Sequence, residues 1–207
     1  MGTRPQSAHN PAVDFQTPPQ ALEPLLPYLR PHWHIWEPAC GDGNLANTLM
    51  DRGYKVTDTD IKRWGDQCVD FLNPKECRNI LYHYDSVWNK HEDRMEEVAV
   101  SARVHAIVTN PPYSRGNMDG FLVRCFELGL PFALLVPLTA LEGASKRIPA
   151  YVEANPRPQV IVMGRVRFTT PTGLQGMDSN PTFGVCWLTW KLGLPHDLMW
   201  WHEGDLR

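Results

Sequence analysis

A tight glycine loop between an apolar segment and an amphipathic one is the feature that most constrains the fold of this chain. The stretch Trp33–Trp36 is mostly apolar, Gly41 and Gly43 follow it, and apolar residues then recur at helical spacing as far as Met50. Glycine lets the backbone turn tightly and approach a ligand closely. This order is typical of the first strand, loop and helix of a nucleotide-binding α/β fold. We therefore expect a doubly wound, mostly parallel α/β sheet.

The spacing of the two glycines argues against a bound phosphate. The pattern Gly-x-x-x-x-Gly-Lys-Ser/Thr occurs nowhere in the chain, and Gly41-x-Gly43 lacks the third glycine of the dinucleotide motif. The loop is instead flanked by two acids, Glu37 and Asp42. A carboxylate at a strand end can accept hydrogen bonds from an ammonium group or a ribose hydroxyl. The loop therefore favours a cationic, phosphate-free nucleoside.

Further acids follow at the ends of two predicted strands. Asp58 lies about twenty residues after the loop, where such folds place an acid that binds ribose hydroxyls. Asp60 is the second candidate for this role. Asp70 and Phe71, at the end of a predicted third strand over 68–72, could accept from an exocyclic amine and cover its ring. Each acid taken alone is better explained as a solvated strand end, so their order along the chain carries the prediction.

The segment Thr109-Asn110-Pro111-Pro112-Tyr113 follows an apolar run over 104–108 and predicts a loop that binds a planar amino group. Two prolines fix φ and remove two backbone donors, which leaves the local carbonyls free to face a ligand. The Asn110 side chain and the Pro111 carbonyl could accept both hydrogens of one amino group. Tyr113 supplies a surface on which a flat base can stack. The alternative is a simple strand-to-loop turn, because Asn-Pro is a common turn signal.

Taken together, these motifs resemble the S-adenosylmethionine-dependent DNA amino-methyltransferases of the adenine-N6 type, including the small enzymes of phages and prophages. The matching elements are a Phe-x-Thr-Pro element at 15–18, a cofactor loop at 37–43, Asp58, the pair 70–71, and the catalytic loop 110–113. The resemblance implies a Rossmann-like class I methyltransferase fold with seven strands, one of them antiparallel near the carboxyl terminus. It also implies S-adenosylmethionine as cofactor and DNA as partner.

The resemblance assigns roles to individual residues. Phe15 would lie against the cofactor adenine, Thr17 would bind the methionine carboxylate, and Glu37 would lie near the methionine amino group. The remaining residues expected to contact the cofactor are Pro38, Ala39, Gly41, Gly43, Asp58, Asp60, Asp70, Phe71 and Asn110. The residues expected to be catalytic are Asn110, Pro111, Pro112 and Tyr113.

The expected reaction is methyl transfer to the N6 amino group of adenine. Members that act on cytosine N4 more often begin the loop with Ser, so Asn110 favours adenine. The same loop also occurs in methyltransferases of RNA guanine and of protein glutamine, which leaves an RNA base or a protein amide as an alternative substrate. A third alternative is a non-catalytic subunit that binds nucleic acid for a partner. The intact loop residues Asn110, Tyr113, Gly41 and Gly43 argue against it.

A paired base cannot reach such a pocket, so the target base must be flipped out or unpaired. The formal net charge of −3 is unusual for a protein that relies on phosphate contacts for affinity. Local basic clusters do occur, at Lys146-Arg147 and at Arg157, Arg165 and Arg167. They are equally well explained as solvated surface charges.

Composition favours one cytoplasmic domain. The 207 residues, 43% of them apolar, suffice for a single core, and we expect a flexible tail over 1–13 followed by one catalytic domain over 14–207. No apolar run approaches the length of a membrane span. The five cysteines and eight histidines show no metal-ligand spacing, so no metal is expected.

Local patterns predict the remaining elements. Expected helices are 20–29, a charged stretch over 82–97, 118–128, and a helix end over 150–154. Expected strands are 104–108, 131–137, 160–163, an edge segment over 165–168, and a final strand over 182–192.

No segment is long enough for a separate target-recognition region. We therefore expect low sequence specificity, a preference for single strands, or recognition by another subunit. The loop 169–181 is expected near the substrate side. Trp187, Trp190, Trp200 and Trp201 are expected to be mainly core, although an exposed Trp200-Trp201 pair would suggest a homodimer or a protein partner.

Overall fold

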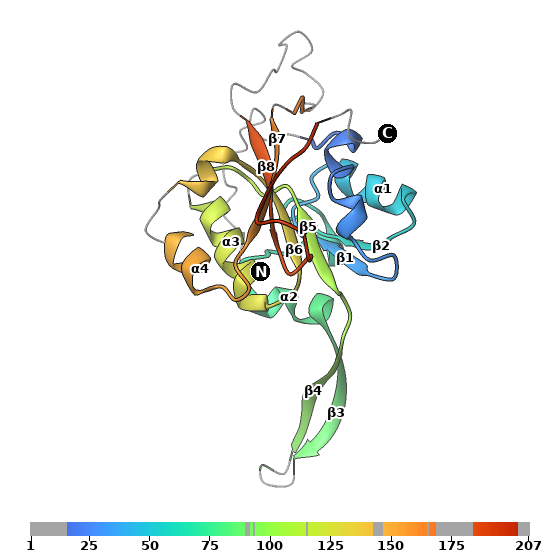
Figure 1. The fold of residues 1–207 in the computed structure, drawn as a ribbon. Helices are drawn as coiled ribbons and strands as arrows, with labels where there is room; N and C mark the ends of the chain where they lie inside the picture. The colour runs from blue at the N-terminus through green and yellow to red at the C-terminus, as the bar shows by residue number, and fades with distance from the viewer. Residues whose placement is uncertain are drawn as a thin grey trace.

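The computed structural model describes residues 16–89, 92, 94–114, 116–142, 147–164, 166–168 and 184–202 (Figure 1). The strands of its main sheet are β1 (His34–Glu37), β2 (Lys55–Asp58), β5 (Ala106–Thr109), β6 (Phe132–Pro137), β7 (Gln159–Gly164), β8 (Val185–Trp190) and β9 (Leu198–Trp200). The α-helices are α1 (Asn44–Asp51), α2 (Pro74–Leu81), α3 (Asn117–Leu128) and α4 (Arg147–Glu153). Short 3₁₀ helices are Pro19–Leu22, Leu26–Tyr28, Gly65–Gln67 and Leu138–Leu141.

The main sheet contains seven strands in the order β2-β1-β5-β6-β8-β7-β9. Its strand pairs are parallel except those of β8, which runs antiparallel to β6 and β7. The predicted seven-stranded, mostly parallel sheet with an antiparallel strand near the carboxyl terminus is therefore confirmed. Carboxyl ends of neighbouring parallel strands meet at one edge of a sheet, so the segments that follow β1, β2 and β5 come together there.

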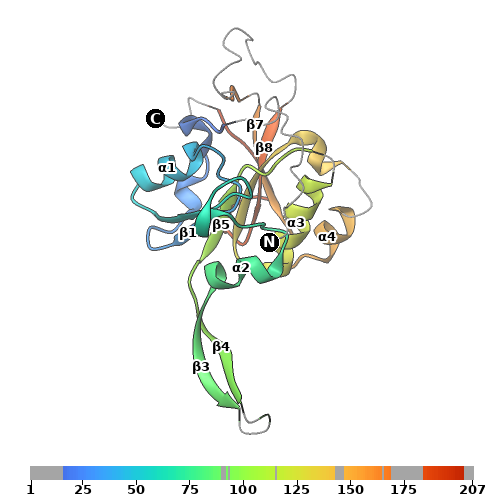
Figure 2. The same cartoon turned by 180° about the vertical axis from the view of Figure 1, so that it is seen from behind.

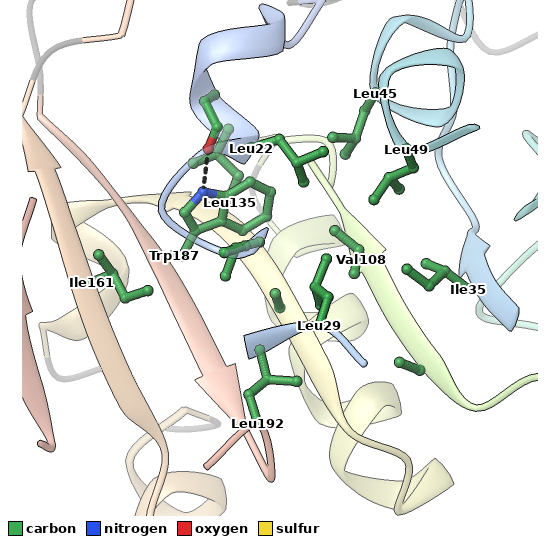
Figure 3. Packing of buried hydrophobic residues seen from close by; sticks show 14 of the residues in the cluster. Leu22, Leu29, Ile35, Leu45, Leu49, Val108, Leu135, Ile161, Trp187 and Leu192 are labelled. Carbon is green, nitrogen blue, oxygen red and sulfur yellow. Dashed lines mark hydrogen bonds between the residues drawn. The ribbon is translucent and has the colours of Figure 1, made fainter. Parts of the chain in front are cut away.

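Alternate residues of the central strands pack on opposite faces of this sheet. Ala106 and Val108 of β5 belong to a core that includes α1 and the first 3₁₀ helices, whereas Ile107 belongs to a core with α2 and α3. Figure 3 shows the first core, where the Trp187 indole donates to the Ala21 carbonyl at 2.7 Å. Every residue of β6 and β8 is buried, which explains their continuous apolar sequences.

The charged stretch over 82–97 is not the helix that we expected. It forms an antiparallel hairpin with the residues that follow, made of β3 (Tyr82–Asn89) and β4 (Arg94–Ala102). The hairpin extends away from the body of the molecule, as Figures 1 and 2 show from opposite sides. Its strands are rich in aromatic and β-branched residues, which favour extended backbone more strongly than the neighbouring charges favour a helix.

The predicted third strand over 68–72 is also wrong. Side chains bind the local backbone there: the Leu72 N–H donates to Asp70 Oδ1 at 3.0 Å, and the Asp70 N–H donates to Glu76 Oε2 at 2.8 Å. Asn73 then caps α2 by accepting from the Lys75 N–H. Local hydrogen bonds of this kind compete with pairing in a sheet and begin a helix instead.

Several smaller differences have similar local causes. The expected helix over 20–29 is two 3₁₀ helices, because Pro24 and Pro27 lack the N–H groups of a continuous α-helix. No edge strand occurs among the described residues 166–168, since β7 ends at Gly164 with φ +74°. The short β9, which we did not predict, pairs with β7 and forms one edge of the sheet.

The carboxyl-terminal tryptophans divide between core and surface. Trp187 and Trp190 are buried, Trp201 packs partly against the core, and Trp200 is 75% exposed. Cys40, inside the glycine loop, is buried. Among the helices that the structure describes, none combines the length and apolar character needed to cross a bilayer.

Candidate functional site

A pocket opens where β1 and β5 end, and it brings together segments that are far apart in the sequence. About 240 Å³ of unfilled space, continuous with solvent, is lined by Gln16, Thr17, Glu37, Ala39, Cys40, Leu45 and Asn110. Four of these, Thr17, Glu37, Ala39 and Asn110, are residues that the sequence predicted for a common site. The part of this space that a water molecule can occupy is only about 20 Å³, little more than the room for one water, so side chains must shift before a larger ligand can enter.

Glu37 is the most deeply buried acid of the site, with 1% of its surface exposed. Its Oε1 accepts from the Ala39 N–H at 3.4 Å and from the Thr109 hydroxyl. Burial, helped by the nearby Asp60 and Asp58, raises the pKa of the Glu37 carboxyl to about 8, although the hydrogen bonds from Thr109 and Ala39 lower it. A cationic group placed in the pocket would reverse this effect by stabilising the carboxylate.

The glycine loop adopts backbone conformations that side chains rarely tolerate. Gly41 has φ +51° and Gly43 has φ +94°, and Gly43 caps the amino end of α1. A Cβ atom on Gly41 would lie 2.7 Å from the Gln16 amide nitrogen. Glycine at position 41 therefore allows the amino-terminal segment to approach the loop closely.

The two acids at the end of β2 have different surroundings. Asp58 lies opposite Glu37 in the register of β1 and β2 and accepts from the Gln67 side chain at 3.3 Å. Both carboxylate oxygens of Asp60 accept backbone N–H groups, from Gly41 at 3.0 Å and from Lys62 at 2.8 Å. The binding of a ribose by Asp58 or Asp60 stays a prediction.

The segment Asn110–Tyr113 continues directly from the carboxyl end of β5. Asn110 is partly buried at the pocket wall, and Pro111 is buried behind it. The Tyr113 hydroxyl donates to the Leu135 carbonyl of β6 at 3.2 Å, and burial raises the pKa of this phenol above its ordinary value. This contact anchors the far end of the loop on the neighbouring strand.

Asp70 and Phe71 lie beside the site but outside the pocket lining. The Phe71 ring is 2% exposed and packs between Trp36 and Phe121, with ring centroids 5.2 and 4.7 Å away. Phe71 therefore has a packing role in this structure. The expected contact of Asp70 and Phe71 with an adenine ring stays a prediction.

Five residues of the described site were not predicted from the sequence as site residues. Gln16, Cys40 and Leu45 line the pocket, Thr109 donates to Glu37, and Arg63 donates to the Gly41 carbonyl. Gln16 and Thr109 each adjoin a predicted residue, so their positions offered a weak signal. Phe15, Lys146, Arg165 and the whole loop 169–181 lie outside the described residues.

The donor set does not suit a metal ion. Among the described residues, no group of three or more His, Cys, Asp or Glu side chains is arranged to hold one. The pocket instead combines a carboxyl group, a hydroxyl group and amides, which suit an amino-acid or amine ligand.

No protein-family profile matches the chain, and no curated protein matches it. Among solved structures, the chain is similar to a modification subunit of a putative type I restriction enzyme from Vibrio vulnificus YJ016, with 13% identity and a TM-score of 0.48 over 86% of this chain and 44% of that chain. It is also similar to the type I restriction enzyme EcoKI M protein, with 15% identity and a TM-score of 0.44 over the same shares. The chain spans less than half the length of either protein, and a function must be argued from its own residues.

Proposed function

We propose that this protein is an S-adenosylmethionine-dependent methyltransferase, with a doubly wound class I fold, that modifies the N6 amino group of adenine in DNA. The observation that carries the proposal is the convergence of Asn110 with Thr17 and Glu37 on one pocket. These residues come from the three segments whose motifs together resemble the adenine methyltransferases. They are separated by 20 or more residues in the sequence, and the pairing of β1 with β5 brings the segments of Glu37 and Asn110 together.

The pocket residues fit the amino-acid end of S-adenosylmethionine. Thr17 can donate to a carboxylate, and the Glu37 carboxyl can accept from an ammonium group once it is ionised. Asp58, at the same sheet edge, can accept from ribose hydroxyls. When bound, this cofactor supplies an electrophilic methyl group.

The catalytic task of the chain is to hold a weakly nucleophilic amine in the right geometry. The lone pair of an adenine amino group is delocalised into the ring, so acceptors placed off the ring plane draw the nitrogen towards a tetrahedral shape. The Asn110 side-chain oxygen and the Pro111 carbonyl can fill this role and stabilise the positive charge that develops. Preorganised groups of this kind contribute about 3 to 4 kcal/mol each in comparable sites.

The proposed substrate is an unpaired or flipped base, recognised with low sequence specificity. The net charge of −3 favours weak, salt-sensitive binding over tight duplex recognition. Flipping a paired base costs a few kcal/mol, which stacking on Tyr113 would partly offset.

The proposal is tested by incubating the pure protein with a radiolabelled methyl donor and single-stranded DNA, duplex DNA, RNA or protein. Label in N6-methyladenine of DNA is the expected product, and Asn110→Ala should reduce kcat about 100-fold or more. Asn79→Ala, on the exposed side of α2, is the matched control and should keep full activity. If only RNA or protein is labelled, DNA is not the substrate. If the protein does not bind S-adenosylmethionine, the proposal is refuted.

A further inference from the structure

The turn over 60–63 holds both backbone polar groups of Gly41. The Gly41 N–H donates to Asp60 Oδ2 at 3.0 Å. The Gly41 carbonyl accepts from Arg63 Nε at 3.1 Å and from Arg63 Nη2 at 2.8 Å. An acidic and a basic residue of one turn therefore bind the N–H and the carbonyl of a single residue in the glycine loop.

The turn itself is closed by its own hydrogen bonds. The Lys62 N–H donates to Asp60 Oδ1 at 2.8 Å, and the Arg63 N–H donates to the Asp60 carbonyl at 3.0 Å. Two backbone bonds join the strand ends beneath it, from Thr59 N–H to the Glu37 carbonyl and from Cys40 N–H to the Thr59 carbonyl. The turn with Asp60 and Arg63 and the glycine loop are thus joined by backbone hydrogen bonds where β2 and β1 end.

Packing around the two glycines completes this arrangement. A Cβ atom on Gly43 would lie 3.4 Å from Arg63 Nη2, and one on Gly41 would lie 2.7 Å from the Gln16 amide nitrogen. The loop is thus enclosed by Arg63 on one side and by Gln16, a pocket residue, on the other. A shift of Arg63 would release the loop and alter the pocket wall.

We propose that Asp60 and Arg63 form a clasp that holds the glycine loop in the shape that accepts a phosphate-free nucleoside and excludes nucleotides. Arg63 is a positioning residue and Asp60 a specificity-determining one. The proposal rests on the proposed function, because it assumes that the pocket takes S-adenosylmethionine.

The exclusion of phosphate follows from the use of the Gly41 N–H. Phosphate-binding loops point backbone N–H groups at the ligand, and their positive ends stabilise its charge. Here the Gly41 N–H already donates to the Asp60 carboxylate, which also places a negative charge beside the loop. Asp58 adds to the negative character of this edge, which favours a cationic ligand over an anionic one.

Ligand binding tests the clasp. Calorimetry with S-adenosylmethionine and with ATP compares the wild type, Arg63→Gln, Arg63→Lys and Asp60→Asn. We expect the wild type to bind S-adenosylmethionine and not ATP. Arg63→Gln should lower the affinity for S-adenosylmethionine about tenfold or more, because it loses two charge-assisted hydrogen bonds to the Gly41 carbonyl. Arg63→Lys should recover part of the lost affinity. Asp60→Asn should reduce the ratio of the affinity for S-adenosylmethionine to the affinity for ATP.

Kinetics separate positioning from catalysis. A clasp acts on the loop and not on the reacting amine, so Arg63→Gln should raise KM for S-adenosylmethionine while kcat at saturation stays within about threefold. Lys55→Gln, which removes an exposed charge at the opposite end of β2, is the matched control and should bind as the wild type does. Unchanged affinity in Arg63→Gln, or ATP binding by the wild type, would overturn the proposal.

Hydrogen exchange at the Gly41 amide tests the clasp without any ligand. The amide should be protected in the wild type and in Lys55→Gln, and it should exchange at least tenfold faster in Asp60→Ala, with Asp60→Asn intermediate because its amide oxygen still accepts. Equal exchange in the wild type and Asp60→Ala would contradict the clasp. Protection at Gly41 in a protein that binds no S-adenosylmethionine would instead reject the proposed function alone.

Discussion

Glu37 shows how one buried side chain links the two motifs of the candidate site. Its carboxyl group lies at the end of β1 and accepts the hydroxyl of Thr109, 72 residues later, at the end of β5. Asn110 follows Thr109 directly. The segments that follow β1 and β5 therefore share a hydrogen bond whose strength depends on the charge of Glu37.

The raised pKa of Glu37 makes the free energy of unfolding depend on pH. The pKa of Glu37 is raised from 4.5 to about 8, so folding takes up a proton between these two pH values. The free energy of unfolding should therefore fall as pH rises from about 5 to about 8, by at most about 1.4 kcal/mol per pH unit, and the slope should vanish above that range. Urea unfolding of Glu37→Gln, which mimics the protonated carboxyl, should lack this contribution.

The same shift predicts proton release on ligand binding. A cationic ammonium beside Glu37 favours the carboxylate, so S-adenosylmethionine should bind more tightly as pH rises towards about 8. Calorimetry at pH 7 in buffers of different ionisation enthalpy should detect release of up to one proton. Equal proton release by the wild type and Glu37→Gln would assign the effect to another group.

Thr109→Val keeps the shape of a fully buried side chain but removes the hydroxyl that Glu37 accepts. We expect it to lower the free energy of unfolding by about 1 to 3 kcal/mol, because a buried acceptor loses its donor. The pKa of Glu37 should rise further, since the Thr109 hydrogen bond lowers it. Thr109→Ser keeps the hydroxyl and should restore the pH profile, although it loses some packing.

At the scale of elements, the glycine loop is held by its neighbours as well as by its own backbone. Gly41 and Gly53 both have positive φ, at +51° and +86°. Only Gly41 faces another side chain, because nothing lies within 4 Å of a Cβ atom on Gly53. A side chain at either position would therefore strain the backbone, but only one at position 41 would also meet a neighbouring side chain.

Alanine at these two positions should separate the two effects. Each substitution should cost about 1 to 2 kcal/mol through backbone strain. Gly41→Ala should in addition displace Gln16 and weaken S-adenosylmethionine binding, while Gly53→Ala leaves affinity unchanged. The double variant Gly41→Ala, Gln16→Ala tests whether the clash with Gln16 causes the lower affinity. Because it removes the displaced side chain, it should bind S-adenosylmethionine more tightly than Gly41→Ala alone.

In the whole molecule, the hairpin β3–β4 and the pocket lie at opposite ends of the central strand β5. The hairpin leads into the amino end of β5, whereas Asn110 follows its carboxyl end (Figure 1). Its base is tied to α2, where Arg78 lies 4.0 Å from the centre of the Tyr84 ring. The segment 85–98 carries five acidic and two basic residues, a balance unsuited to contact with nucleic-acid phosphates.

Replacing 85–98 with Asn-Gly should therefore leave the body of the protein intact. Tyr84 and Ala99 are paired across the hairpin, so this replacement keeps the base and the contact of Tyr84 with Arg78. It removes the exposed ion pair of Arg78 with Glu97, which contributes little to stability. We expect the melting temperature to change by no more than about 4 °C and the affinity for S-adenosylmethionine to stay within about twofold. A large loss of affinity would show that the hairpin supports the site from a distance.

Elements with long apolar runs could be predicted from the sequence, and elements decided by local polar contacts could not. The runs 104–108 and 131–137 became the buried strands β5 and β6 because burial on both faces requires apolar residues throughout. The stretch 68–72 was mistaken for a strand because the sequence does not reveal that Asp70 and Glu76 bind its backbone. The hairpin was mistaken for a helix because charge obscured its strand-forming residues.

The sequence by itself determined the motif order and the kind of fold, because glycine spacing, strand-end acids and apolar periodicity are local properties of the chain. Only the tertiary structure decided which side chains meet: that Thr109 binds Glu37, that Arg63 and Asp60 hold Gly41, and that Phe71 packs in the core. These contacts depend on the strand order of the sheet and on side-chain directions. Both are set by packing between distant segments, which spacing along one chain does not encode.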